Sequence, residues 1–237
     1  MRLYYLTPAQ HAIANIALSR IKISRFADLN DPFELLSVDL ADRAQRAKFK
    51  SLKEEVNKNT GLLCMSKEWK SPLMWGHYAD KHRGICLGFD VDDGDTVEVN
   101  YSLKLEKSDI YSPDGQPSEK FQRELMRTKF HDWKYENEVR VFLPLAEMES
   151  EGGLYFQKFS NRLALKEVIL GSECPMSVEL VRSLVTDLYA ANVVKVSKAR
   201  IAFTRFEVLT DKKATQADKS ESGRYNRRNR FGPQLRD

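Results

Sequence analysis

Hydrophobic and polar positions recur with two different periods along residues 1–210, and these periods predict strands interrupted by helices. Alternating or continuously apolar runs predict strands at 2–7, 61–66, 84–91, 95–102, 137–145 and 163–171. Apolar positions at helical spacing predict helices at 8–20, 40–57, 72–82, 118–133 and 177–189. Residues 193–210 predict one long strand or a hairpin. The pattern therefore indicates an α+β fold with a mixed, mostly antiparallel sheet and flanking helices.

The composition predicts a single domain at residues 1–210 followed by a basic tail at 211–237. Hydrophobic residues make up 42% and charged residues 30% of the 237 residues, which is typical of globular proteins. The tail holds eight Lys or Arg against four Asp or Glu, so it carries the whole net charge of +4. Because the tail is poor in aliphatic residues, we expect it to be disordered, either solvated or gripping a nucleic acid.

The sequence contains no signal for a membrane or for secretion. No apolar run approaches the roughly 18 residues of a membrane helix, and the first ten residues lack the blocks of a secretory signal. We therefore expect a cytoplasmic protein. Cys64, Cys86 and Cys174 are odd in number and widely spaced, which favours reduced thiols over a disulfide framework or a zinc site. No metal is expected.

The segment MWGHYADKHRGICLGFD at residues 74–90 combines aromatic, imidazole and glycine residues. On the predicted helix Trp75, Tyr78 and His82 share one face, because they are three, four and seven residues apart. Gly84 would stop this helix, and Gly88 would let a ligand or another backbone approach the next strand closely. Two interpretations stay open: a ligand-holding surface, and a helix end packed into the core.

The segment HDWKYENEVRVF at residues 131–142 places two carboxylates two positions apart. If Glu136 and Glu138 lie on one strand, both face the same side and the proton affinity of one of them rises. Arg140 would then lie beside Glu138 and neutralise it. The alternative interpretation is a salt-bridged, solvent-facing strand.

The segment ADLNDPFELL at residues 27–36 predicts a turn. Asn30 and Asp31 precede Pro32 and can hydrogen-bond to their own backbone, and Phe33 is expected to return the chain to the core. A structural turn explains the segment, with Asp31 or Glu34 as contacts at the rim of a site.

Four ordered motifs resemble an abundant bacterial family of unknown function. They are NDPFE, the 74–90 segment preceded by CMS, WKYENEVR, and LKEVILG before a helix, and the resemblance covers about residues 3–209. A more remote similarity links residues 3–24 and the ENEVRV segment to ADP-ribosyltransferases, notably the nucleic-acid-modifying toxins of bacterial defence systems. This similarity implies an ADP-ribosyltransferase-like fold.

The resemblance to ADP-ribosyltransferases also implies a set of site residues. Glu138 corresponds to the catalytic carboxylate, and Glu136 would orient or deprotonate the acceptor. NAD, used as a substrate, would contact the first strand, the end of a second strand, and the 74–90 segment. The implied contacts are Tyr5, Thr7, Ser66, Trp75, Tyr78, His82 and Arg83, although Tyr5 replaces the usual His or Arg and Ser66 stands without a full Ser-Thr-Ser.

The resemblance therefore implies an enzyme that transfers ADP-ribose from NAD to a macromolecule, with RNA or DNA favoured and recruited by the basic tail. Such an enzyme would act as a toxin or an anti-phage defence effector, with an antitoxin or another defence protein as a partner. Two alternatives stay open. One is a metal-dependent nuclease toxin, and the other is a non-catalytic module that binds nucleic acid or protein.

Overall fold

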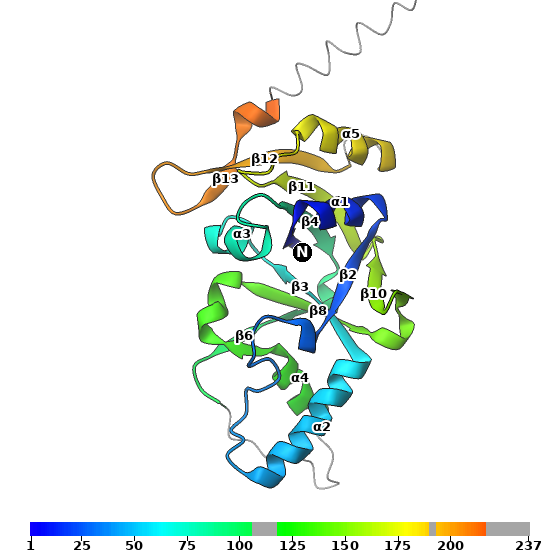
Figure 1. Cartoon of the computed structure of the whole chain (residues 1–237), viewed down its shortest axis with the longest axis vertical. Coiled ribbons are helices and arrows are strands. Elements are labelled where there is room, and N and C mark those ends of the chain that lie inside the picture. The colour runs from blue at the N-terminus through cyan, green and yellow to red at the C-terminus, as the bar shows by residue number, and fades with distance from the viewer. Residues whose placement is uncertain (106–117, 190–192, 217–237) are drawn as a thin grey trace, which may run out of the picture. The chain divides into compact units, whose positions relative to one another are not determined.

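The computed structural model describes residues 1–105, 118–189 and 193–216 (Figure 1). The chain divides into two compact units, each assembled from non-consecutive segments. Unit 1 comprises Met1–Leu3, Ser19–Glu68 and Asp90–Ala164, and unit 2 comprises Tyr4–Leu18, Trp69–Phe89 and Leu165–Asp237. The strands pair in a mixed, mostly antiparallel pattern and are accompanied by helices, so the α+β class predicted from the sequence is confirmed. The finer, ADP-ribosyltransferase-like fold stays a prediction.

The strands of unit 1 are ordered β9-β10-β2-β3-β8-β5, and each pairs antiparallel with its neighbours in this order. Their bounds are β2 (Arg20–Arg25), β3 (Thr60–Ser66), β5 (Thr96–Glu98), β8 (Glu138–Pro144), β9 (Glu149–Glu151) and β10 (Leu154–Lys158). The longest register joins β3 to β8, from Thr60 opposite Pro144 to Ser66 opposite Glu138. A short parallel pair joins β6 (Asn100–Ser102) to β7 (Thr128–Phe130).

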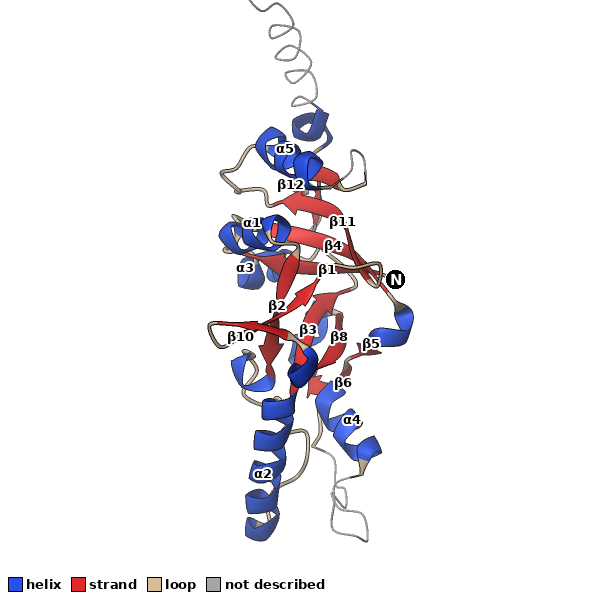
Figure 2. Cartoon of the chain, turned by 90° about the vertical axis from the view of Figure 1, so that its right-hand side faces the viewer, coloured by secondary structure: helices blue, strands red, loops and turns tan. Residues whose placement is uncertain are grey.

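The helices of unit 1 are α2 (Arg43–Asn59) and α4 (Glu119–Arg127), with short 3-10 turns η1 (Phe26–Asp28), η2 (Asp93–Asp95), η3 (His131–Glu136) and η4 (Leu145–Glu147). Asp42 caps α2, since its Oδ1 accepts the N–H of Gln45 at 2.8 Å. The helix leads directly into β3, as Figure 2 shows. Its apolar stripe packs with residues of η1, β3 and α4 into one core: Phe26, Phe49, Leu52, Val56, Leu62 and Leu125. Burial of this stripe explains why a mostly charged segment is helical.

The strands that lie wholly or mainly in unit 2 are ordered β13-β12-β11-β4-β1. Their bounds are β1 (Arg2–Thr7), β4 (Ile85–Val91), β11 (Leu163–Leu170), β12 (Lys195–Ile201) and β13 (Val208–Thr210). Strands β11 and β12 are parallel and connected through α5 (Val178–Leu188), whereas β12 and β13 form the hairpin that the sequence allowed. Helix α1 (Ala9–Ala17) starts after Pro8 as predicted, and α3 (Pro72–Tyr78) precedes β4.

Two predicted elements are divided in the structure. The strand expected at 95–102 breaks at Val99, whose N–H donates to Glu138 O at 3.1 Å, so β5 pairs with β8 and β6 pairs with β7. The helix expected at 118–133 ends at Arg127 and continues as β7 and η3, because Thr128 begins the pairing with β6. Both divisions follow from partners that are distant in the sequence. The pattern also missed β2, β9 and β10.

The first residues of the predicted tail are hydrogen-bonded within unit 2. Asp211 N–H donates to Lys198 O at 2.7 Å, and Lys198 N–H donates to Thr215 Oγ1 at 3.2 Å. Residues 217–237 lie outside the described residues, so the disordered, nucleic-acid-binding tail stays a prediction there. Among the described helices, none has the length and apolar character needed to span a membrane.

Candidate functional site

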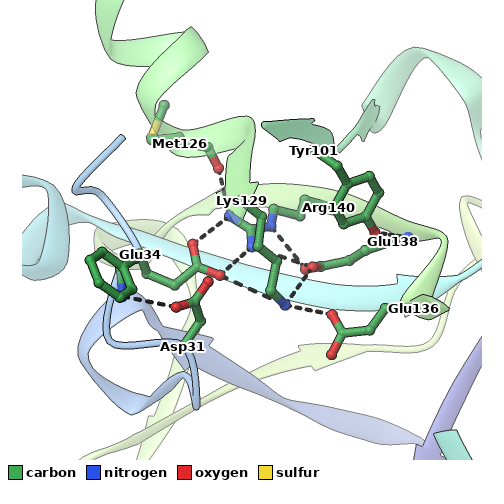
Figure 3. Close-up of polar contacts among 9 residues, drawn as sticks. Asp31, Glu34, Tyr101, Met126, Lys129, Glu136, Glu138 and Arg140 are labelled. Atoms are coloured by element: carbon green, nitrogen blue, oxygen red, sulfur yellow. Dashed lines mark hydrogen bonds and ion pairs between the residues drawn. The ribbon is translucent and has the colours of Figure 1, made fainter. Parts of the chain in front are cut away.

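Unit 1 contains a buried group of charged side chains, which we call the charged cluster (Figure 3). Its residues come from the 27–36 turn, from β7, from the end of η3 and from β8. Each member exposes at most 6% of its surface: Glu34, Lys129, Glu136, Glu138 and Arg140. Charges buried to this degree are retained in proteins when they are paired and hydrogen-bonded.

Arg140 joins two carboxylates of the cluster and is itself fully buried. Its guanidinium group binds Glu34 through both terminal nitrogens, and its Nε donates to Glu138 Oε1 at 2.8 Å. The second N–H of Nη1 donates to Met126 O at 2.7 Å. This fork-to-carboxylate geometry is the most favourable one for an arginine pair. The prediction that Arg140 lies beside Glu138 and neutralises it is confirmed.

Lys129 holds the two carboxylates of the E-x-E segment together. Its Nζ donates to Glu136 and, at 3.0 Å, to Glu138 Oε2, and it lies 3.9 Å from Glu34 Oε1. The ammonium group also lies 5.0 Å from the centre of the Trp133 ring, within range of a cation–π contact. Lys129 therefore bridges residues from three separate segments.

The local backbone brings Glu136 and Glu138 together in a way that the period of a strand did not predict. Glu136 ends η3, Asn137 is left-handed with φ 45°, and β8 starts only at Glu138. The condition that both glutamates lie on one strand is not met, because Glu136 belongs to η3 and only Glu138 belongs to β8. The alternative of a solvent-facing, salt-bridged strand is also wrong, since Glu136 and Glu138 are 3% and 5% exposed.

The electrostatics of the cluster keep Glu138 ionised. Burial by itself would raise the pKa of Glu138, but the positive charges of Arg140 and Lys129 outweigh it and lower the pKa to about 2. Burial would lower the pKa of Lys129, and the carboxylates of Glu138 and Glu136 instead raise it. For Glu34, burial outweighs Arg140 and the pKa is raised. The two glutamates bound to one arginine thus differ in proton affinity.

Two hydroxyl residues lie next to Glu138: Ser66 through strand pairing, and Tyr101 through a hydrogen bond with the Glu138 backbone. Ser66 ends β3 directly opposite Glu138 in the β3–β8 register, and it is 2% exposed. Its Oγ accepts the N–H of Glu68 at 3.0 Å. The hydroxyl oxygen of Tyr101 accepts the N–H of Glu138 at 2.8 Å, and burial, together with the Glu138 charge, raises the Tyr101 pKa to about 12. Tyr101 is therefore a neutral group beside an anionic one.

The 27–36 turn contributes buried carboxylates, and not only contacts at the rim of a site. Asp31 Oδ1 accepts the N–H of Phe33 at 2.9 Å, which confirms the self-capped turn, but Asp31 and Glu34 are each only 4% exposed. Phe33 does not return the chain to the core, because 56% of it is exposed. Leu35 fills that place instead, 1% exposed and left-handed with φ 58°.

In unit 2, the 74–90 segment forms a left-handed turn rather than a continuous helix. Helix α3 ends at Tyr78, and Asp80, Lys81 and His82 all have positive φ, from 44° to 69°. The predicted helix to residue 82 is therefore wrong. His82 N–H nevertheless donates to Trp75 O at 3.2 Å, and the two rings stack with centroids 6.2 Å apart. We call residues 80–82 the left-handed turn.

Packing explains most of the side chains around the left-handed turn. Trp75 is fully buried and its indole N–H donates to Trp69 O, whereas Tyr78 is half-buried and Arg83 is exposed. Burial lowers the pKa of His82, against the charge of Glu173, and its Nδ1 is buried without a partner among the described residues. His82 is thus favoured as a neutral imidazole.

Two of the three glycines of the 74–90 segment, Gly84 and Gly88, serve close packing. A Cβ on Gly84 would lie 2.3 Å from Thr7 O, and one on Gly88 would lie 3.0 Å from Glu167 Cβ and 3.2 Å from the Tyr4 ring. Gly88 therefore does allow a close approach, but its nearest neighbours are side chains rather than the ligand or backbone that the sequence predicted.

The predicted site residues fall into two sets. Glu136, Glu138 and Ser66 lie in unit 1, and Tyr5, Thr7, Trp75, Tyr78, His82 and Arg83 lie in unit 2. Thr7 is buried and Tyr5 is half-buried on β1. The convergence of the two sets on one substrate stays a prediction. Lys129 was missed, because the sequence pattern predicts it within the helix at 118–133, where a lysine carries no signal of burial.

Among the described residues, no group of three or more His, Cys, Asp or Glu is arranged to hold a metal ion. Comparison with known families shows that residues 74–141 match the model of DUF2971, described as a protein of unknown function. The matched stretch begins within α3, includes the left-handed turn and the E-x-E segment, and ends within β8. Neither the search of characterised proteins nor the search of solved structures found a significant match.

Proposed function

We propose that this protein is a glycosyl-transfer enzyme of the ADP-ribosyltransferase type, which cleaves NAD and passes ADP-ribose to a macromolecule, with RNA or DNA as the favoured acceptor. One observation carries the proposal: Ser66 ends β3 directly opposite Glu138 at the start of β8. The resemblance implied a hydroxyl residue at the end of one strand and a catalytic carboxylate on another. The register brings these two residues together without any adjustment.

Glu138 has the charge that this chemistry requires. Cleavage of the bond between nicotinamide and ribose C1′ passes through a state with positive charge on the ribose, as glycoside cleavage does. A carboxylate held ionised by Arg140 and Lys129 stabilises that charge at any physiological pH. The bond electrons leave with nicotinamide, which becomes neutral. The acceptor then forms a bond to C1′ and gives up its proton to Glu136.

The other site residues supply recognition within the proposal. Tyr5 and Tyr78 are half-buried, so each offers part of an aromatic face to nicotinamide, whereas the buried Trp75 supports His82 by stacking. Arg83 is exposed and suits a phosphate. The role in toxicity or phage defence, and a partner antitoxin, belong to the same proposal.

The test compares wild type with Glu138→Gln, Glu136→Gln and Ser66→Ala, measuring nicotinamide release and transfer of labelled ADP-ribose with nucleic acid and cell extract as acceptors. Loss of an electrostatic stabiliser lowers the rate roughly a hundredfold or more, so Glu138→Gln should lose turnover while keeping NAD affinity. Glu98→Gln is the matched control, because this carboxylate lies on the neighbouring strand β5 and is 64% exposed.

A wild-type protein that neither binds NAD nor releases nicotinamide would overturn the proposal. Circular dichroism of each variant separates lost chemistry from lost folding, since Glu138 belongs to the charged cluster.

A second candidate, binding without catalysis, rests on a different pocket of unit 1. A cavity of about 250 Å³ is lined mainly by apolar side chains, among them Phe33, Leu36, Leu103 and Phe130. Phe33 and Leu103 are 56% and 72% exposed, which is typical of a surface that binds an apolar group. Substituting Phe130→Ser and Leu103→Ser should then abolish binding of the protein or nucleic-acid partner and leave any NAD turnover unchanged.

A further inference from the structure

A second pocket of unit 1, which we call the acidic pocket, lies between residues of the 27–36 turn and α2. Its volume is about 340 Å³, within the range of small-ligand sites. Phe26, Leu29 and Leu35 supply apolar walls. Asp31 and Glu34 from the turn, and Glu54 from α2, supply carboxylates.

For Asp31, no ion pair is found among the described residues. Its Oδ1 accepts the N–H of Phe33, but its Oδ2 is buried and has no hydrogen-bond partner among the described residues. Glu34 is bound by Arg140 through both oxygens, and Glu54 lies 3.9 Å from Lys50 Nζ. A buried carboxylate oxygen without a donor is costly, so a group that donates to Asp31 is strongly favoured.

We propose that the acidic pocket binds a small molecule with a primary ammonium group on a short apolar body. The ammonium donates to Asp31 Oδ2, and the body packs against Phe26, Leu29 and Leu35. One free oxygen suits a compact ammonium better than a planar guanidinium, whose fork requires two. This proposal does not rest on the proposed transferase activity, although Glu34 belongs both to the acidic pocket and to the charged cluster.

Lys53 places a positively charged side chain in the wall of the acidic pocket. Its side chain lines the pocket from α2, and no salt bridge of Lys53 is found within the described ranges. Burial lowers its pKa, against the charge of Glu34. A cationic ligand therefore meets repulsion from Lys53, and removal of this charge is expected to tighten binding.

The experiment titrates the full chain with n-butylamine, n-butanol and methylguanidine, followed by calorimetry and by ligand-observed NMR. We expect n-butylamine to bind about tenfold or more tightly than n-butanol, because only the amine provides a charge-assisted hydrogen bond. Methylguanidine should bind more weakly than n-butylamine. Equal affinities for the amine and the alcohol would overturn the proposal, as would the absence of amine binding, which would indicate a water at Asp31.

Variants assign the binding to Asp31. Asp31→Asn keeps an acceptor for Phe33 N–H but removes the charge, and should weaken n-butylamine binding by about tenfold or more. Asp39→Asn is the matched control, because Asp39 Oδ1 caps the N–H of Ala41 in the same way at 3.1 Å. Lys53→Met should strengthen binding severalfold.

These variants keep the proposal falsifiable if Asp31→Asn does not fold. Unchanged affinity in Lys53→Met would place the amine elsewhere, and unchanged affinity in a folded Asp31→Asn would do the same. A lysine-containing peptide that binds much more tightly than n-butylamine would replace the small molecule by a protein partner and overturn that part of the proposal.

Discussion

The charged cluster of unit 1 and the left-handed turn of unit 2 are stabilised by different kinds of interaction. In the cluster, two cations and three carboxylates are withdrawn from water and satisfy one another. In the turn, three consecutive residues adopt a left-handed backbone, supported by a Trp75–His82 stack and by backbone hydrogen bonds. Left-handed conformations cost roughly 1–2 kcal/mol per residue, so the packing around them has to compensate.

The difference predicts which perturbation each region senses. A buried ion cluster responds to the loss of one charge and to pH, because its members depend on being ionised together. A strained turn held by close contacts responds to added volume and is much less sensitive to charge. Three predictions test this contrast, from the largest expected effect to the smallest.

Arg140→Met should cause the largest loss of stability. The substitution leaves Glu34 and Glu138 buried without their shared cation, and breaking a buried ion pair in this way costs about 3–5 kcal/mol. Urea unfolding measures the change. Arg162→Met is the control, because its side chain is 67% exposed and its ion pairs with Asp92 and Asp95 lie at the surface, where they contribute little.

The double variant Arg140→Met with Glu34→Gln should recover part of this loss, since it removes one of the stranded carboxylates. If the single and double variants are equally unstable, the loss reflects packing around the arginine stem and the ionic account of the cluster is wrong.

The pH dependence of stability should show the ionised state of Glu138. Its pKa in the folded state, about 2, lies below the ordinary value of 4.5, so its stabilisation is fully present above about pH 4.5 and is lost as pH falls toward 2. The shift corresponds to about 3 kcal/mol at 1.36 kcal/mol per pKa unit. The raised pKa of Glu34 acts in the opposite direction, because protonation relieves the cost of burying its charge.

Urea midpoints at about pH 6, 4 and 3 test the prediction, with Glu138→Gln as the comparison. The variant should be less stable near neutral pH and should lose less stability on acidification than wild type. Parallel pH curves for the two proteins would mean that Glu138 does not carry the acid-sensitive stability of unit 1.

Two glycine variants should change stability in opposite directions, because Gly84, which follows the left-handed turn, is tightly packed and Gly76 in α3 is not. Gly84→Ala places a Cβ 2.3 Å from Thr7 O and 2.8 Å from Ala79 Cα, and should cost about 1–3 kcal/mol. Gly76→Ala meets nothing within 4 Å on α3 and should stabilise by about 0.5–1 kcal/mol. Thermal unfolding of the two variants measures both signs. Equal effects would contradict the tight packing of Gly84.

Local patterns in the sequence determined the elements that satisfy themselves within a short stretch. The start of α1 after Pro8, the cap of the 27–36 turn by Asp31, the strand at 138–144 and the proximity of Arg140 to Glu138 all depend on residues a few positions apart. Period, capping and turn chemistry are local properties, so one sequence is enough to read them.

Tertiary structure decided the features that depend on distant partners. The strand at 95–102 divides because its halves pair with β8 and β7, and the helix before Thr128 stops for the same pairing. Lys129 and Glu34 are separated by 95 residues in the sequence. They come together in the charged cluster only because β7, β8 and the 27–36 turn meet in the fold. Burial and charge pairing arise from contacts across such distances, and no local period encodes them.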